Sequence, residues 1–119
     1  MINIDQLKSE LAHFIGTENW YKSPLFPRYT YTDGVKYLAE QTNCYWLLDY
    51  IFSNQIDEKI QGQAFQNWII HVTSNSAVIV VEDGDNQLLR NFRIPFTNFP
   101  LDEFSLWFTN NTLILPSEY

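Results

Sequence analysis

The residue types that carry out nucleophilic catalysis occur in this chain as a single cysteine, Cys44, with two candidate helpers, His71 and Asp49. A thiol nucleophile needs a base and an orienting group beside it. Cys44 lies on the apolar stripe of a predicted helix, where a buried thiol is chemically inert. We therefore interpret Cys44 as a core residue and His71 as a surface or half-buried histidine. A small hydrolase that uses both remains the alternative.

Metal and cofactor chemistry has no support in the residue spacing. His13 and His71 lie far apart in the sequence, and no Cys or His pair has the spacing of metal ligands. The acidic run 82–86 lacks the later bidentate Glu of a calcium loop, and its Asp83–Gly84 pair instead predicts a hairpin turn. The sequence thus predicts no catalytic residue, no metal and no cofactor.

The aromatic-rich segment 20–37 is the strongest candidate for a binding surface. Pro24 and Pro27 exclude a regular helix there, and a long irregular segment in a small protein is often functional. The segment leads into a predicted helix N-terminus, which can hold an anion or carboxylate, and aromatic side chains beside it can line a cleft. The other interpretation is that these side chains only seal the core. The candidate ligand- or partner-binding residues are Trp20, Tyr21, Phe26, Tyr29, Tyr31, Asp33, Lys36 and Tyr37.

Length and charge limit the classes of protein. The chain has 119 residues, 17% of them aromatic, and its 7 Lys and Arg against 14 Asp and Glu give a net charge of −7. This length predicts a single domain over residues 1–119. Direct nucleic-acid binding is not expected, because phosphate neutralisation needs a basic surplus. No apolar run approaches the ~20 residues of a membrane helix, and one cysteine without a secretion signal predicts a cytoplasmic protein.

Three helices are predicted in the first half of the chain. The first covers residues 3–15, with Asn3 as its cap and Gly16 as its end. The second begins at Thr32–Asp33 and runs to about residue 42, and Asn43 separates it from a third helix that ends near residue 54. The first helix places its apolar residues on one stripe, which consists of Ile4, Leu7, Leu11, Phe14 and Ile15.

From residue 63 the apolar pattern changes to a period of two, which predicts strands. Turn signals at 74–76, 83–84 and 110–111 divide this region into strands near 65–72, 77–81, 88–96, 104–108 and 113–115. Helices followed by strands predict an α+β fold. We expect the N-terminal helices to pack on one face of an antiparallel, roughly five-stranded meander sheet.

Four sequence blocks then point to a family. YTDGVKYLA at 31–39, YWLLD at 45–49, PFTNFPL at 95–101 and LPSEY at 115–119 resemble an uncharacterised family of small bacterial proteins of unknown function. The resemblance covers roughly residues 16–119. It implies a bacterial cytoplasmic protein of a kind associated with cyanobacteria and mobile genetic elements. It implies no activity, cofactor or catalytic residue.

These observations favour a non-enzymatic protein-interaction or binding module. The expected partner is another protein, such as a phage, plasmid or host-defence component, or a second copy in a homodimer. A small hydrolase and a self-associating structural protein are the alternatives. One specific form of the interaction hypothesis is an acidic inhibitor of a nucleic-acid-binding protein. That form predicts one coherent acidic face built from Glu82, Asp83, Asp85, Asp102 and Glu103.

Overall fold

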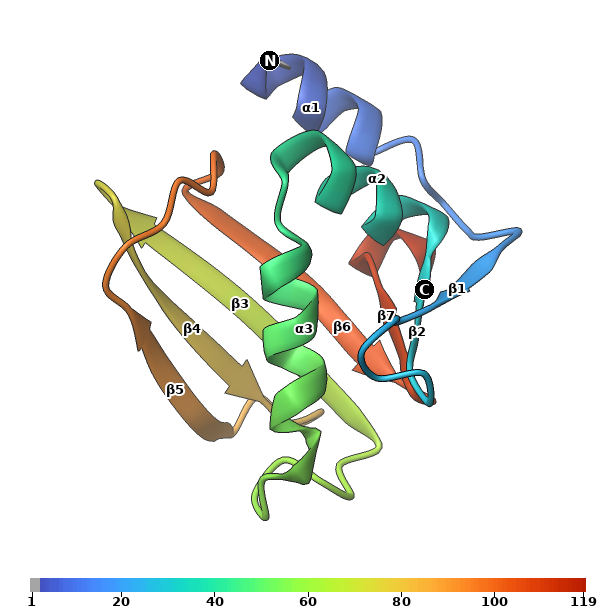
Figure 1. Cartoon of the computed structure of the whole chain (residues 1–119), viewed down its shortest axis with the longest axis vertical. Coiled ribbons are helices and arrows are strands. Elements are labelled where there is room, and N and C mark those ends of the chain that lie inside the picture. The colour runs from blue at the N-terminus through green and yellow to red at the C-terminus, as the bar shows by residue number, and fades with distance from the viewer. Residues whose placement is uncertain (1–2) are drawn as a thin grey trace.

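The structure is a computed structural model, and it describes residues 3–119. Over this range it has three α-helices and a seven-stranded sheet, with α3 lying across one face of the sheet (Figure 1). The helices are α1 (Ile4–Leu11), α2 (Asp33–Thr42) and α3 (Tyr45–Ser53), with short 3-10 turns η1 (Asn54–Ile56) and η2 (Pro116–Glu118). The strands are β1 (Trp20–Lys22), β2 (Thr30–Thr32), β3 (Phe65–Thr73), β4 (Ser76–Glu82), β5 (Leu88–Ile94), β6 (Glu103–Thr109) and β7 (Thr112–Ile114). None of these helices is both long enough and apolar enough to cross a membrane.

The α+β class is confirmed, but the predicted five-stranded antiparallel meander is wrong. The strand order is β1-β2-β7-β6-β3-β4-β5, and the β2–β7 pair is parallel. The chain does not continue from β5 to a neighbouring strand, because β6 returns to pair with β3 on its other side. Segment 20–31, predicted as irregular, supplies β1 and the start of β2. Each of these strands has only three residues, too few for a two-residue period to be visible.

The helices begin at the residues that the sequence indicates, and α2 also ends where predicted, whereas α1 ends early. Asn3 caps α1 by accepting hydrogen bonds from the backbone of Asp5 and Gln6. Asn43 ends α2 in the left-handed conformation with φ 56°, so α2 and α3 are two helices, as predicted. The helix predicted over 3–15 is shorter, because α1 ends at Leu11 and leaves Ile15 82% exposed.

The core lies between the helices and one face of the sheet. Alternate residues of β3, β4 and β6 are buried on that face, including Trp68, Ile79 and Leu106. They pack against the buried side of α3, which consists of Leu47, Leu48, Ile51 and Phe52. Phe96 had been expected on a core-facing stripe, but it follows the end of β5 and is 71% exposed. The opposite face of β3–β6 carries the alternating residues that the helices do not cover.

Candidate functional site

The N-terminus of α2 is occupied by a carboxylate from the chain's own C-terminal end. Glu118 accepts hydrogen bonds from the backbone N–H of Gly34 (3.1 Å), from Thr32 Oγ1 (2.6 Å) and from the backbone N–H of Leu115 (2.9 Å). A negative charge is favoured there by the helix dipole. The sequence predicted that this helix terminus could hold an anion or carboxylate. The carboxylate of Glu118, from the same chain, occupies the position that an external anion would take.

Gly34 is required by this contact. A Cβ atom at position 34 would lie 2.5 Å from Leu115 Cδ1 and 2.8 Å from Glu118 Oε1. Any larger residue at position 34 would therefore force the side chains of Leu115 and Glu118 to move. Two of the sequence blocks that carry the family resemblance, 31–39 and 115–119, thus meet in one structural contact.

Asp33 ties the loop after α1 to the start of α2. Its carboxylate accepts hydrogen bonds from the backbone N–H of Glu18 (3.0 Å) and Asn19 (3.2 Å) and from the hydroxyl of Tyr21 (2.8 Å). The backbone N–H of Glu18, with these other donors, lowers the pKa of Asp33 to about 2. Asp33 is therefore ionised at neutral pH, and its charge holds the loop rather than a ligand.

The loop that follows α1 and the outer side of α2 line an open groove of about 690 Å³. Its aromatic wall contains Phe14 and Tyr37, whose ring centroids lie 5.4 Å apart, and Tyr21. Lys36 Nζ lies 4.9 Å above the centroid of the Tyr21 ring and 3.6 Å from Glu40 Oε1. The groove therefore combines this aromatic wall with the carboxylates of Glu18, Asp33 and Glu40, and Lys36 is paired with one of them.

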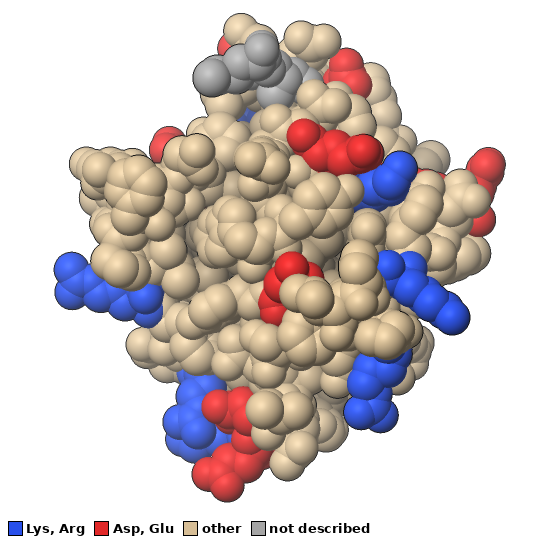
Figure 2. Space-filling view, viewed as in Figure 1, with Lys and Arg blue, Asp and Glu red and all other residues tan. Residues whose placement is uncertain are grey.

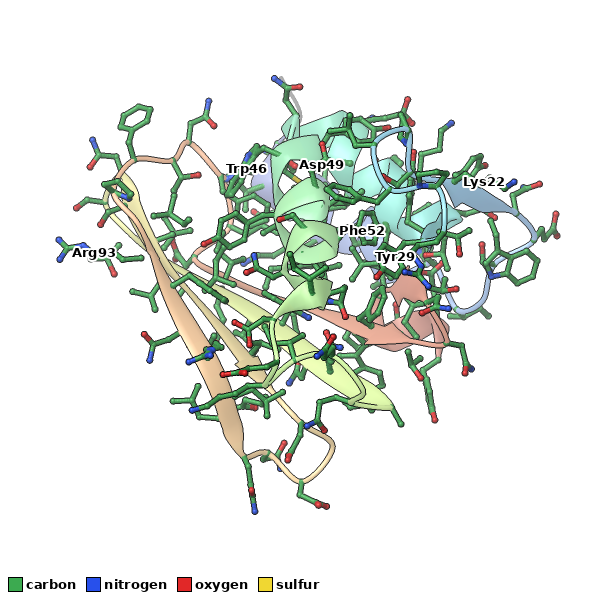
Figure 3. The ribbon with its side chains drawn as sticks, turned by 60° about the horizontal axis from the view of Figure 1, so that its bottom comes forward. Lys22, Tyr29, Trp46, Asp49, Phe52 and Arg93 are labelled. Atoms are coloured by element: carbon green, nitrogen blue, oxygen red, sulfur yellow. The ribbon has the colours of Figure 1, made fainter. Side chains whose placement is uncertain are left out.

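The structure divides the eight candidate residues of segment 20–37. Four of them, Tyr21, Asp33, Lys36 and Tyr37, line the groove. Three others pack on the core: Tyr31 is only 8% exposed, and Phe26 and Tyr29 contact Phe52 at 6.4 and 5.5 Å between ring centroids (Figure 3). Trp20 is 60% exposed and is not among the residues that line the groove. The two sequence interpretations, a binding surface and core sealing, thus apply to different residues.

A second exposed surface, which we call the α3 face, lies on the outer side of α3. Figure 2 shows a single acid over this helix within a wide area that has no other charge. The only charged residue of α3 is Asp49, which projects away from the sheet (Figure 3). None of the ion pairs formed within residues 3–119 involves Asp49, and desolvation raises the pKa of its carboxyl. Asp49 is thus a half-buried carboxylate without a counter-charge in the described part of the chain.

Aromatic side chains surround Asp49 on the α3 face. Tyr45 and Trp46 precede it by one helical turn, and Tyr45 is 37% exposed. Trp46 lines a hollow of about 210 Å³ together with Phe96. We define the α3 face as Tyr45, Trp46, Asp49 and Phe96. The sequence prediction did not include this surface, because it considered only the apolar stripe of this helix and took Asp49 as a possible orienting group for Cys44.

The hydrolase alternative fails on geometry. Cys44 is fully buried on the helix side of the sheet, and burial raises the pKa of its thiol to about 11. His71 lies on the opposite face of the sheet, where its Nδ1 is 3.4 Å from Glu103. The sheet separates the two side chains, so they cannot act as nucleophile and base. Among residues 3–119 no group of three His, Cys, Asp or Glu residues is arranged to hold a metal ion.

The acids of the predicted acidic face lie at opposite ends of β3. Glu82 pairs with Asn67 near its first end, and Glu103 pairs with His71 near its other end. Four residues of strand separate these positions by about 13 Å. Asn67 and His71 both alternate with the core-facing residues of β3, so Glu82 and Glu103 lie on the same face of the sheet, and the acidic-inhibitor form of the interaction hypothesis stays a prediction.

Comparison with known proteins adds the family. Residues 5–119 match the family described as "Family of unknown function (DUF6876)". No curated protein and no solved structure matches the chain. The match covers nearly the whole chain, including the four blocks at 31–39, 45–49, 95–101 and 115–119. The chain therefore belongs to this family of unknown function.

Proposed function

We propose that this protein is a non-enzymatic protein-interaction module and that its α3 face binds a basic segment of a partner protein. The observation that carries the proposal is Asp49, a carboxylate without a counter-charge among residues 3–119, which lies one helical turn from Tyr45 and Trp46 on a surface with no other charge (Figure 2). Desolvation without a counter-charge costs free energy in the isolated protein. A Lys or Arg side chain from a partner offsets that cost through a charge-assisted hydrogen bond.

The residues around Asp49 suit a basic and partly apolar segment. Trp46 and Tyr45 offer ring faces to the stem and head of an Arg or Lys side chain. Trp, Tyr and Phe are also the residue types that supply most of the binding energy at protein interfaces. The net charge of −7 attracts a basic partner over a longer distance.

The α3 face is connected to the groove beside α2 through a line of tyrosines. Tyr45 contacts Tyr31 at 6.3 Å between ring centroids, and Tyr31 contacts Tyr21 at 5.6 Å. Tyr21 lines the groove. Tyr31 is only 8% exposed, so this line of tyrosines links the two surfaces through the core and offers no continuous surface path to a partner segment.

The test is a titration followed by backbone NMR shifts, with three synthetic peptides that share length and apolar residues. The peptides carry Arg, Gln or Glu at the variable positions. We expect the Arg peptide to bind most tightly and to shift amides of α3. Asp49→Lys abolishes this binding, whereas Asp85→Lys, an equal charge change in an exposed turn, leaves it within about twofold. Equal binding of the Glu peptide, or unchanged binding to Asp49→Lys, contradicts the proposal.

The identity of the partner requires capture from bacterial cells. The family resemblance directs the search to phage, plasmid and host-defence proteins with an exposed basic segment. Affinity capture with the unmodified protein and with Asp49→Lys in parallel identifies the relevant partner as a protein retained only by the former. A partner set that is identical for both proteins contradicts a role of the α3 face.

A further inference from the structure

The face of the sheet opposite the helices carries an apolar centre that the helices do not cover and that the described chain covers only at its edge, where Tyr119 packs on Trp107 at 5.4 Å between ring centroids. Phe65 and Ile69 on β3, Val80 on β4 and Trp107 on β6 are partly exposed and do not pack against the core, and Val78 on β4 is 42% exposed. We propose that a second copy of this chain binds to this open face and forms a twofold symmetric dimer. This surface is separate from the α3 face, so the proposal does not depend on the partner proposed there.

The open face carries Glu103 and Arg93 at the two ends of one row across four strands, and a further acid, Glu82 on β4, lies beside Asn67 of β3. The strand registers place Glu103, His71, Val78 and Arg93 side by side in that order, from β6 through β3 and β4 to β5. Three strand spacings separate the two ends by about 14 Å. The row thus has an acid at one end, a base at the other and no permanent charge between them.

Neither end of the row is neutralised within the described chain. Arg93 is exposed, projects away from α3 (Figure 3) and forms no ion pair with residues 3–119. Glu103 lies 3.4 Å from His71 Nδ1, but 64% of its side chain is exposed. Both groups therefore remain available to charges on another molecule.

This arrangement is complementary to itself. Consider a twofold axis that lies between the two facing sheets, runs parallel to the strands and passes midway between β3 and β4. Rotation about this axis keeps each residue at the same height along the strands and places one end of the row opposite the other end of the partner's row. Glu103 then faces the partner's Arg93, and Arg93 faces the partner's Glu103. Packed sheets are about 10 Å apart, a gap that facing Arg and Glu side chains bridge together.

The next row fits the same axis. Its order is Ser105, Ile69, Val80 and Asn91, so Ile69 faces the partner's Val80 at the centre while Ser105 faces the partner's Asn91 at the rim. Apolar side chains thus meet in the middle and polar ones at the edge, as in known interfaces. An axis perpendicular to the strands instead brings Glu103 toward Trp107 and Thr109 of the partner, which leaves the charges without partners. Charge complementarity therefore selects the parallel axis.

The experiment measures mass by light scattering and sedimentation over about 1 µM to about 1 mM protein. The unmodified protein is expected to change from monomer to dimer within this range. Arg93→Glu and Glu103→Arg each place like charges opposite one another, so each should weaken the dimer by at least about tenfold. The double variant exchanges the two ends of the row and should restore dimerisation to within about threefold of the unmodified protein. Glu58→Arg and Lys59→Glu, the matched changes in an exposed turn, should have no effect.

Each outcome decides the proposal. A monomer at every concentration overturns it, and so does a dimer that neither single reversal weakens. Weakening by both single variants without rescue by the double variant also overturns the assigned axis. Circular dichroism and denaturation midpoints equal to those of the unmodified protein show that the variants are folded, which is expected because both side chains are exposed.

Discussion

Two neighbouring residues of β3, Gln66 and Asn67, show how differently the two faces of the sheet are completed. Gln66 is 1% exposed on the helix side, where it exchanges hydrogen bonds with Gln55 at 2.8 and 2.9 Å and accepts another from Trp68 Nε1. Asn67 points to the open face, and its Oδ1 is buried without a partner in the described chain. Buried polar groups are normally paired. The polar groups of Gln66 are thus paired within the chain, whereas Asn67 Oδ1 is covered by the chain itself and has no hydrogen-bond partner among residues 3–119.

The charged groups repeat this contrast. On the helix side the carboxylates of Glu118 and Asp33 each accept several hydrogen bonds from the chain's own backbone and hydroxyls. On the open face Arg93 has no ion pair with any residue from 3 to 119. The paired carboxylates therefore have structural roles, whereas Arg93 is the kind of group that the two proposed binding surfaces would use.

The largest effect is expected from leucine substitutions at positions 66 and 67. Gln66→Leu leaves Gln55 Oε1 and Trp68 Nε1 buried without partners, which should lower the free energy of unfolding by about 3 kcal/mol. Asn67→Leu removes an unpaired oxygen and should change it by less than about 1 kcal/mol. Urea denaturation of both variants at micromolar concentration measures the difference. Equal losses would remove the contrast between the faces.

The contact between Gly34 and the C-terminal turn is expected to have the next largest effect. Gly34→Ala forces its new methyl group against Leu115 and Glu118 and should cost about 2 kcal/mol of unfolding free energy. Gly16→Ala is the matched control, since nothing lies within 4 Å of a Cβ there, and it should stay within about 0.5 kcal/mol of the unmodified protein. If both variants have the same stability, the close approach at α2 has no energetic importance.

Asp33 is expected to contribute stability that depends on pH. Its pKa is lowered from 3.8 to about 2 in the folded protein, so its contribution is complete above about pH 4 and is lost as the pH falls toward 2. Asp33→Asn should lower the unfolding free energy by about 1 kcal/mol at pH 7 and flatten its dependence on pH below 4. Denaturation at several pH values checks this, with Asp102→Asn as an exposed control that keeps the slope.

The smallest effect is expected at Asp49, with the opposite sign. Desolvation raises the pKa of this carboxyl, so its ionised form opposes folding once the pH is above the folded pKa. Asp49→Asn should therefore stabilise the free protein by up to about 0.5 kcal/mol at pH 7, and the gain should disappear in acid. A loss of stability at pH 7 instead would show that Asp49 has a structural partner.

Local patterns predicted the parts of the fold that depend on neighbouring residues. Asn3, Thr32 and Asn43 indicated helix ends because capping uses residues close in sequence. The position of β6 beside β3 was not predicted, since segment 95–102 is long enough to return to either edge of the hairpins. β1 and β2 form through pairing with each other and with β7, at the far end of the chain.

The candidate site was predictable to a similar extent. Tyr21, Asp33, Lys36 and Tyr37 were found because they lie close together in the sequence. The contact of Glu118 with Gly34 joins residues 84 positions apart, and no local pattern indicates it. The alternation along β3 correctly placed His71 and Ile70 on opposite faces of the sheet. Alternation alone does not predict which of the two faces the helices cover.

The central claim is that the open face binds a second copy of the chain and the α3 face binds a basic peptide. The most direct test replaces the four tryptophans with 5-fluorotryptophan and observes them by fluorine NMR. The four are Trp20, Trp46, Trp68 and Trp107. Trp107 lies on the open face, Trp46 on the α3 face, and Trp68 is buried as an internal reference. We predict that the Trp107 resonance shifts as the protein concentration rises and that the Trp46 resonance shifts when the Arg peptide is added. A Trp107 resonance independent of concentration, together with a Trp46 resonance independent of the peptide, would contradict the account.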